Sequence, residues 1–282
     1  MTTPEPAGAT HPLVTAIVPT YNGAETVGRT LESLAAQTWP ALEILIGDDG
    51  STDATPQIIE DFAAERDDVR IVRRSANLGW LGNSNDLMSR ATGTFSFFAF
   101  HDDVVDPTYV ERLADALIAD ESAILSFSDM TVTDVDGTVE TRAFDELEGM
   151  SSAADRGIVM ARRPYDWWVP NRGLFRTSAY ERTGGIHRNR SGEYSADWTW
   201  LLHLSLLGGF VRVPEVLCHK HYTKRSLSKS WPHDPVQRAN LLRSGIDEVL
   251  GSSASPRTKA AVAGRLIVRI LRAKARRARR AR

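Results

Sequence analysis

Hydrophobic positions in the first part of the chain follow two different periods. Short, nearly unbroken apolar runs bounded by turn residues predict buried strands. Between these runs, apolar residues recur every three or four positions, as Val27, Leu31 and Leu34 do, which predicts helices with one buried face. The predicted strands cover residues 14–18, 42–47, 69–72 and 94–100, and the predicted helices cover 24–37, 55–66 and 82–90.

Strands that alternate with helices predict an α/β fold, with a mainly parallel sheet buried on both faces by helices. Ligands of such sheets bind outside the carboxyl ends of the strands. The residues expected there are Pro19 to Asn22, Asp48 with Asp49, and His101 to Asp103. These three loops are therefore predicted to form one ligand site.

The pattern is less regular in the second part of the chain. A helix is predicted over residues 107–119, a strand over 124–128 and a hairpin turn at 134–137. A strongly apolar helix is predicted over 195–208, where glycines end it. Residues 141–160 show no clear period.

Adjacent aspartates are the strongest chemical signal. Asp102 and Asp103 directly follow an apolar strand, and neighbouring carboxylates raise each other's pKa unless a cation lies beside them. Mg²⁺ or Mn²⁺ would supply that cation, since such ions bind one or two carboxylates and leave positions for phosphate oxygens. Capping of the following helix explains one such pair better than a metal does. A second pair, Asp48 and Asp49, at the same sheet edge favours a shared ligand.

The loop "TYNG" after the first strand is a good turn sequence, and its aromatic Tyr21 also offers a flat face to a nucleotide base. Neither G-x-G-x-x-G nor G-x-x-x-x-G-K-[ST] follows this strand, which argues against a dinucleotide-binding fold and a P-loop NTPase. A nucleotide held through a metal ion fits the loops better.

Composition sets the broad class. With 282 residues, 42% hydrophobic and 25% charged, the chain is long enough for one large domain with appendages. No apolar run is long enough to span a membrane, and the first dozen residues lack the features of a signal peptide. The single cysteine, Cys218, excludes an internal disulfide and suits a reducing cytoplasm. We interpret Cys218 as a small apolar residue.

The carboxyl-terminal segment is strongly basic. Residues 265–282 contain nine Arg or Lys and no acid, although the whole chain has a net charge of −2. Val262, Leu266 and Ile270 recur at a spacing of four, beside Ala263, Ile267 and Leu271. This pattern predicts an amphipathic basic helix that binds an anionic membrane surface. Nucleic-acid binding, which we do not expect, and a merely solvated helix are the alternatives.

Several linked motifs resemble those of family 2 glycosyltransferases with the GT-A fold. They include "VTAIVPTYNGAETVGRTLESLAAQTWPALEILIGDDGSTDAT", "NLGWLGNSNDLMSRATGTFSFFAFHDDVVDPTYVE", "SADWTWLLHLSLLGGFVRVPEVL" and "HYTKRSLSKS". They occur in the family's order over roughly residues 14–230. The resemblance implies an inverting, nucleotide-sugar-dependent transferase that acts in cell-surface polysaccharide or glycolipid synthesis.

The resemblance also implies a donor site. UDP or dTDP is expected ahead of GDP as the nucleotide. The family's acidic loop has a first aspartate where this chain has Phe100, so the metal site is expected to be weaker. The residues implied to bind the nucleotide sugar are Pro19, Thr20, Tyr21, Asp49 and Asp102, and those implied to bind Mg²⁺ or Mn²⁺ are Asp103 and His221.

On the acceptor side, the resemblance implies that Asp197 is the general base, with Ser195 free to cap the helix instead. The acceptor is expected to be a glycan or a lipid-linked sugar. Trp167, Trp168 and Arg172 are candidates for an acceptor groove, and a place in the core explains them equally well.

The expected organisation is an arm over residues 1–12, a GT-A domain over 13–235 and a helical extension with a basic tail over 236–282. Residues 13–105 would form the nucleotide-sugar half, and 106–235 the acceptor half. Two other functions are open. A metal-dependent nucleotidyltransferase is disfavoured because "PTYNGAET" has no Lys or Arg, and a non-catalytic binding protein is disfavoured by the acid at Asp197. The expected location is cytoplasmic, with membrane association at the inner face.

Overall fold

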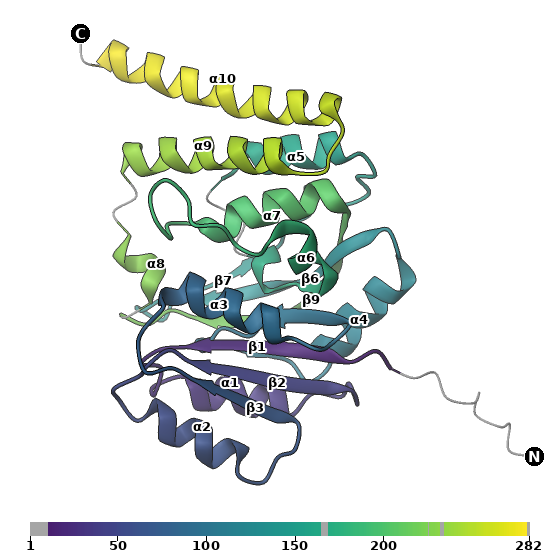
Figure 1. The fold of residues 1–282 in the computed structure, drawn as a ribbon, viewed down its shortest axis with the longest axis vertical. Coiled ribbons are helices and arrows are strands. Elements are labelled where there is room, and N and C mark those ends of the chain that lie inside the picture. Colours follow the sequence, from purple (N-terminus) through teal and green to yellow (C-terminus); the bar gives the residue numbers. More distant parts are fainter. Residues whose placement is uncertain (1–10, 165–168, 225, 232–233, 281–282) are drawn as a thin grey trace, which may run out of the picture.

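A computed structural model describes residues 11–164, 169–224, 226–231 and 234–280, which form a nine-stranded sheet with helices on both faces (Figure 1). Its first half is parallel, in the order β3-β2-β1-β4. These strands are β1 (Val14–Thr20), β2 (Leu42–Asp48), β3 (Val69–Arg73) and β4 (Phe95–Phe98). The helices among them are α1 (Val27–Ala35), α2 (Thr55–Ala63) and α3 (Gly79–Arg90). The predicted βαβ pattern is confirmed.

The second half of the sheet mixes strand directions. The order continues β8-β6-β9-β5, with β7 paired to β6. Strand β8 runs antiparallel to both β4 and β6, whereas β6 and β9 are parallel. These strands are β5 (Asp103–Val105), β6 (Ala123–Thr133), β7 (Val139–Arg142), β8 (Leu174–Arg176) and β9 (Gly209–His221). The predicted turn at 134–137 connects β6 to β7 in an antiparallel hairpin.

Alternation along β4 shows how both faces are covered. The ring of Phe97 packs against Tyr109 of α4 (Tyr109–Ala119), with 5.4 Å between ring centroids. The next ring, Phe98, packs on the opposite face against Trp200 of α7 (Ala196–Leu207), at 6.0 Å. Successive strand residues point to opposite faces, so two adjacent phenylalanines bury both sides of the sheet.

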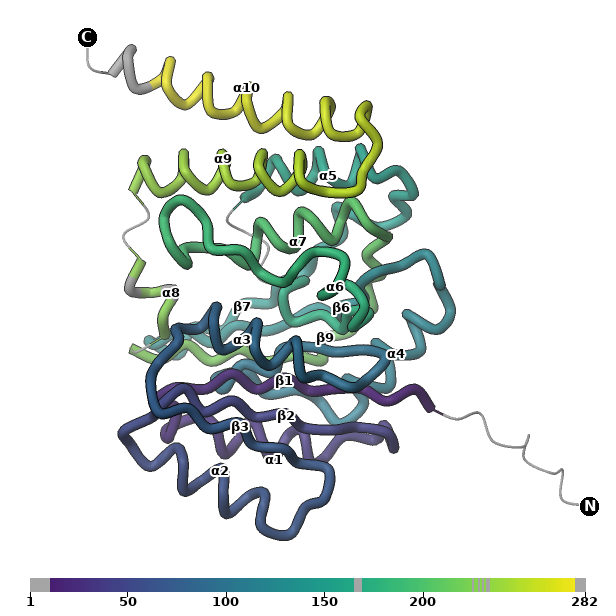
Figure 2. The backbone as a smooth tube through the Cα atoms, viewed as in Figure 1, coloured from purple at the N-terminus to yellow at the C-terminus, as the bar shows by residue number. Residues whose placement is uncertain are grey.

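Helix α7 is apolar all round, and such a helix must be covered on every side. It contacts β6 on one side and α5 (Ala153–Arg162), α6 (Ser178–Thr183) and α9 (Pro235–Gly251) on others. Helix α10 (Pro256–Arg280) then packs on α5 and α9. Figure 2 shows α9 and α10 stacked beyond α7, at the end of the molecule away from β3. The predicted helical extension therefore forms α9 and α10.

Helix α5 lies partly within the region that shows no clear sequence period. Its residue Gly157 is buried, and a Cβ there would lie 2.7 Å from Val262 of α10. A glycine in the middle of a helix weakens the helical pattern of the sequence. At this position the two helices approach too closely for a larger side chain.

The predicted arm is held to the domain at its last two residues. The Trp39 ring meets His11 edge-on at 4.7 Å, and its Nε1 donates to the Pro12 carbonyl at 3.1 Å. Residues 1–10 lie outside the described residues. Within the described ranges, no helix combines the length and apolar character needed to cross a bilayer.

Candidate active site

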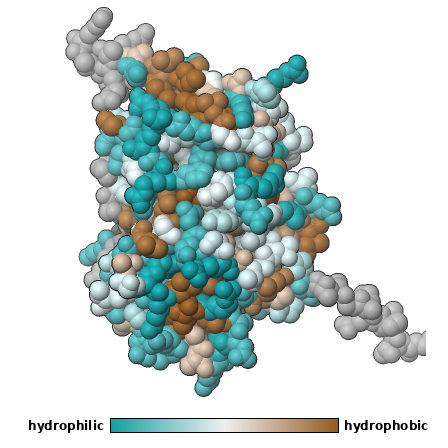
Figure 3. All heavy atoms as spheres, in the orientation of Figure 1, coloured by the Kyte–Doolittle hydropathy of each residue, from teal (hydrophilic) through white to brown (hydrophobic). Residues whose placement is uncertain are grey.

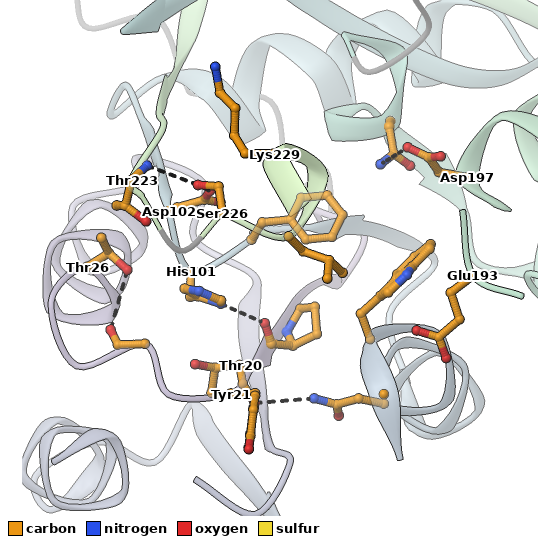
Figure 4. Close-up of a pocket in the computed structure, with 18 of the residues that line it drawn as sticks. Thr20, Tyr21, Thr26, His101, Asp102, Glu193, Asp197, Thr223, Ser226 and Lys229 are labelled. Atoms are coloured by element: carbon orange, nitrogen blue, oxygen red, sulfur yellow. Dashed lines mark hydrogen bonds between the residues drawn. The ribbon is translucent and has the colours of Figure 1, made fainter. Parts of the chain in front are cut away.

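A cavity of about 820 Å³ opens where β1, β2 and β4 end, at the sheet edge predicted to bind a ligand. The start of α7 and the segment around α8 (Leu227–Ser230) bound it on other sides. Figure 4 shows Thr20 and Tyr21 apart from Asp197, which lies across the cavity. The structure brings together the predicted site residues Pro19, Thr20, Tyr21, Asp49, Asp102, Arg172 and Asp197.

The loop after β1 presents Tyr21 to this cavity, with 45% of the residue exposed. The next residue, Asn22, has a φ of 47°, in the left-handed region that asparagine tolerates better than most residues. Its backbone N–H donates to Ser51 Oγ at 2.9 Å, and its Oδ1 accepts from the Thr52 N–H at 2.9 Å. The loops after β1 and β2 therefore brace each other and hold Tyr21 at the cavity wall.

The two aspartates at the end of β2 have different surroundings. Asp48 accepts a hydrogen bond from the Ser51 N–H within its own loop, whereas Asp49 lines the cavity. The carboxylate of Asp49 is buried and accepts from the Leu78 N–H at 2.9 Å. A buried carboxylate at a cavity wall can accept hydrogen bonds from N–H and hydroxyl groups of a ligand.

The two aspartates after β4 also face in different directions. Asp102 lines the cavity, whereas Asp103 begins β5 and is only 2% exposed. Arg172 Nε donates to Asp103 Oδ2 at 2.8 Å. Lys220 Nζ lies 2.9 Å from Asp102 Oδ2 and 3.5 Å from Asp103 Oδ1. Two buried cations, Arg172 and Lys220, thus relieve the repulsion between the carboxylates. The sequence predicted a divalent ion for this role.

The donor atoms fit a divalent ion at Asp102 better than at Asp103. Burial opposes ionisation of Asp102, but the charges of Lys220 and His101 outweigh it and lower its pKa. No group of three or more His, Cys, Asp or Glu in the described ranges could hold a metal ion by itself. Mg²⁺ commonly binds one or two carboxylates together with substrate phosphates. The residues therefore fit an ion that binds with a diphosphate at Asp102. They do not fit one at Asp103, which is buried against Arg172.

Strand alternation decides the place of His221. Lys220 and Tyr222 line the cavity, and His221 between them is not among the lining residues. Burial and the charge of Arg29 on α1 lower the pKa of His221. The prediction of His221 as a metal ligand therefore finds no support in the geometry.

The predicted acceptor groove is only partly described. Trp167 and Trp168 lie outside the described residues. Arg172, in a short 3₁₀ turn over Pro170–Arg172, lines the cavity. Its guanidinium lies 4.8 Å from the ring centroid of Phe100 and is paired with Asp103. Arg172 therefore joins the cavity wall to the acidic pair, and its contact with an acceptor stays a prediction.

Asp197 lies in the first turn of α7, half-buried at the cavity wall. Its Oδ1 accepts from the Trp198 N–H at 3.0 Å, and its Oδ2 accepts from Asn171 Nδ2 at 3.2 Å. The expected cap at Ser195 is wrong, because this N-cap residue makes no side-chain capping bond. Burial raises the pKa of Asp197, although the charge of Arg172 acts in the other direction. A carboxylate with raised proton affinity at a cavity wall suits a general base.

A second acid, Glu193, lies near Asp197 in sequence but has different neighbours. Its Oε1 accepts from Arg188 Nη2 at 2.8 Å. Burial raises its pKa, and the nearby charge of Asp49 acts in the same direction. Glu193 therefore belongs to the nucleotide side of the cavity and is already paired.

Four buried polar atoms at the cavity have no hydrogen-bond partner among the described residues. They are Thr20 Oγ1, Trp80 Nε1, Asn83 Oδ1 and Asn171 Oδ1. Buried polar atoms are nearly always bonded, so these atoms favour a polar ligand in the cavity. Sequence reasoning missed Asn83, Asn171 and Lys220, because each reaches the cavity from an element outside the three predicted loops.

Comparison with known proteins identifies the family. Residues 15–172, more than half of the chain, match the family model described as glycosyl transferase family 2. The chain belongs to this family and is a glycosyltransferase, which confirms the sequence-based resemblance. An uncharacterized glycosyltransferase of Haemophilus influenzae is 23% identical over 82% of this chain and 72% of its own length. The hyaluronan synthase of Pasteurella multocida is 25% identical over 83% of this chain but only 24% of its own length.

Solved structures confirm the predicted GT-A type of α/β fold. S. aureus TarS 1-349 in complex with UDP-GlcNAc has a TM-score of 0.70 at 18% identity, covering 90% of this chain and 71% of its own. The mannosyltransferase PcManGT from Pyrobaculum calidifontis, in complex with GDP-Man and Mn²⁺, has a TM-score of 0.60 at 19% identity. It covers 96% of this chain and 76% of its own.

Proposed function

We propose that this protein transfers a sugar, with inversion, from a nucleoside-diphosphate sugar to a hydroxyl group of a glycan or lipid-linked acceptor. The observation that carries this proposal is one cavity that Tyr21, Asp49 and Asp102 line at the sheet edge, with Asp197 across from Tyr21 and Asp102. Similarity to a hyaluronan synthase supports a role in polysaccharide synthesis.

The nucleotide would bind at the loops after β1 and β2. Tyr21 offers its ring to the base, and Asp49 accepts a hydrogen bond from the base or ribose. Thr20 Oγ1, which has no hydrogen-bond partner in the described part of the chain, and the adjacent Pro19 complete this wall. UDP or dTDP is the expected nucleotide. The similar S. aureus structure holds UDP-GlcNAc and the similar P. calidifontis structure holds GDP-Man, so both support a nucleotide-sugar donor.

The diphosphate would lie beside Asp102. When bound, Mg²⁺ or Mn²⁺ would neutralise the charge that develops on the departing diphosphate. Asp102 is the residue that would hold this ion, because its lowered pKa keeps it ionised at the cavity wall. Lys220, bonded to Asp102, adds a second positive charge in the same place.

Asp197 would take the proton from the acceptor hydroxyl as that oxygen attacks the anomeric carbon. Asn171 donates to one carboxylate oxygen, and the Trp198 N–H donates to the other, so the group is held in one orientation. Attack from the face opposite the diphosphate inverts the anomeric configuration in one displacement.

We place this reaction in the cytoplasm, because a single cysteine suits a reducing compartment. Cys218 is buried in β9, and burial raises the pKa of its thiol. It therefore behaves as the small apolar residue that the sequence analysis predicts.

Thermal unfolding with a panel of UDP-, dTDP- and GDP-sugars tests the donor site. A donor at 100 times its dissociation constant should stabilise the protein by about 2.7 kcal/mol. Tyr21→Ala should weaken binding of that donor about tenfold, because stacking on an aromatic ring is lost, whereas Tyr21→Phe keeps the ring and should bind nearly as wild type.

Product analysis separates the possible functions. With donor and acceptor present, we expect nucleoside diphosphate and a product of inverted anomeric configuration, detected by NMR. Release of pyrophosphate would point to a nucleotidyltransferase. Donor binding without transfer to any glycan acceptor would point to a binding protein, and no binding across the panel would refute the proposal.

A further inference from the structure

Helix α10 has two apolar sides, and only one is used inside the protein. Val262, Ala263 and Leu266 are buried where α10 packs on α5 and α9. Gly157 of α5 meets Val262 at this contact. The apolar stripe predicted from a spacing of four is thus divided, and its first two members belong to the core.

The other apolar side points to solvent. Ile267, Val268 and Leu271 are 46%, 41% and 58% exposed. Residues three and four apart are neighbours on a helix, so these side chains form one continuous strip. Figure 3 shows hydrophobic atoms gathered over α10 at the top of the molecule. Isolated exposed apolar residues are common, but an adjacent group on one face indicates a binding surface.

Basic residues lie along the same strip. Arg265 precedes Val268 by three positions and Arg272 follows it by four, so both flank the strip, and both are exposed. From residue 265 to the end of the chain there are nine Arg or Lys and no acid. We call Ile267, Val268, Leu271, Arg265 and Arg272 the outer face of α10.

We propose that the outer face of α10 binds the surface of an anionic lipid bilayer. Its apolar residues would enter the boundary between headgroups and acyl chains, and its arginines would contact the anionic headgroups. A solvated helix has no need of the exposed apolar strip. A nucleic acid would use the arginines but leave the strip in water. Charge and apolar area together therefore favour lipid over both alternatives.

This surface is separate from the catalytic cavity. The described residues that line the cavity include none from α10. Binding of α10 to a bilayer would keep the protein beside lipid-linked acceptors without changing the chemistry of transfer. Removing residues 265–282 is a poor test, because it also removes the buried Leu266. Substitutions on the outer face avoid this damage.

Co-sedimentation of the full chain with vesicles tests the proposal. Wild type should bind phosphatidylcholine vesicles that contain phosphatidylglycerol, bind pure phosphatidylcholine far less, and lose binding as salt is added. Ile267→Ser with Leu271→Ser should weaken binding about tenfold or more, because buried apolar area is lost. Ile118→Ser on α4 is the matched control, since Ile118 is 47% exposed on another helix. It should bind as wild type.

The same assay defines the contrary results. Thermal unfolding of each variant, which should match wild type, excludes loss of fold. Absence of binding to anionic vesicles would overturn the proposal. A second contrary result is that the double serine variant binds as wild type while Arg265→Glu with Arg272→Glu abolishes binding. Only charge would then matter, as it would for a nucleic acid. None of these readouts depends on sugar transfer, so they stand apart from the proposed catalytic function.

Discussion

Asp197→Asn separates a catalytic role from a structural one at the start of α7. The Asn Oδ1 can still accept from the Trp198 N–H, as Asp197 does now. Its Nδ2 would face the Nδ2 of Asn171, which now donates to the carboxylate. Because Asn171 Oδ1 has no partner among the described residues, a flip of that amide restores the bond. We therefore expect stability within about 1 kcal/mol of wild type, the worth of one hydrogen bond.

The rate of transfer should respond very differently. Asparagine cannot accept the acceptor's proton, and loss of a general base typically costs about 10²–10⁴-fold. At about 1.4 kcal/mol for each tenfold step, this corresponds to roughly 2.8–5.6 kcal/mol in activation free energy. Nucleotide binding should not change, because Asp197 lies across the cavity from Tyr21. Acceptor-dependent release of nucleoside diphosphate measures the rate, and calorimetry measures donor binding.

The pH profile adds an independent check. Burial raises the pKa of Asp197 above the ordinary 3.8, and a base works only when ionised. The wild-type rate should therefore rise with pH through this raised pKa, and the residual rate of Asp197→Asn should lack that rise. Glu193→Gln is the control, and it should keep the rise. A well-folded Asp197→Asn protein with near-normal transfer would refute the reasoning and point to Glu193.

Two further predictions concern the ion pairs. Asp103→Asn should lower the free energy of unfolding by about 3 kcal/mol, because it removes the carboxylate charge from a buried ion pair with Arg172. Asp102→Asn should chiefly weaken metal-dependent donor binding. Denaturation measures the loss of stability, and calorimetry measures donor binding in the presence of metal. If Asp103→Asn weakened metal-dependent donor binding and Asp102→Asn lowered stability, Asp103 would be the metal ligand. The carboxylate of Glu248 accepts hydrogen bonds from His187 and His203. Burial acts to raise the pKa of Glu248, but the two hydrogen bonds outweigh burial, so the pKa is lowered. The bond to Glu248 in turn raises the pKa of His187. The stabilisation that Glu248 and its histidines give the folded protein should be lost as the pH falls below about 4.5 or rises above about 6.5, which are the ordinary pKa values of Glu and His. If the free energy of unfolding of Glu248→Gln depended on pH in the same way as that of wild type, this prediction would be contradicted.

The sequence by itself determined the parallel half of the sheet and the location of the site. Strand and helix periods depend on neighbours within a few residues, so the first four strands could be predicted. Parallel strands place their carboxyl ends at one edge, and this brought Tyr21, Asp49 and Asp102 to one cavity as predicted. The position of Asp197 followed from motif resemblance, because its helix starts far along the chain.

Only the tertiary structure decided which acid of each pair faces the cavity and what neutralises it. Asp103 meets Arg172 across 69 residues of sequence and Lys220 across 117. No local pattern predicts such contacts, since they depend on how β5, β9 and the 3₁₀ turn pack. The outer face of α10 has the same origin. The sequence shows a helix with apolar residues on more than one side, but packing against α5 and α9 decides which side reaches solvent.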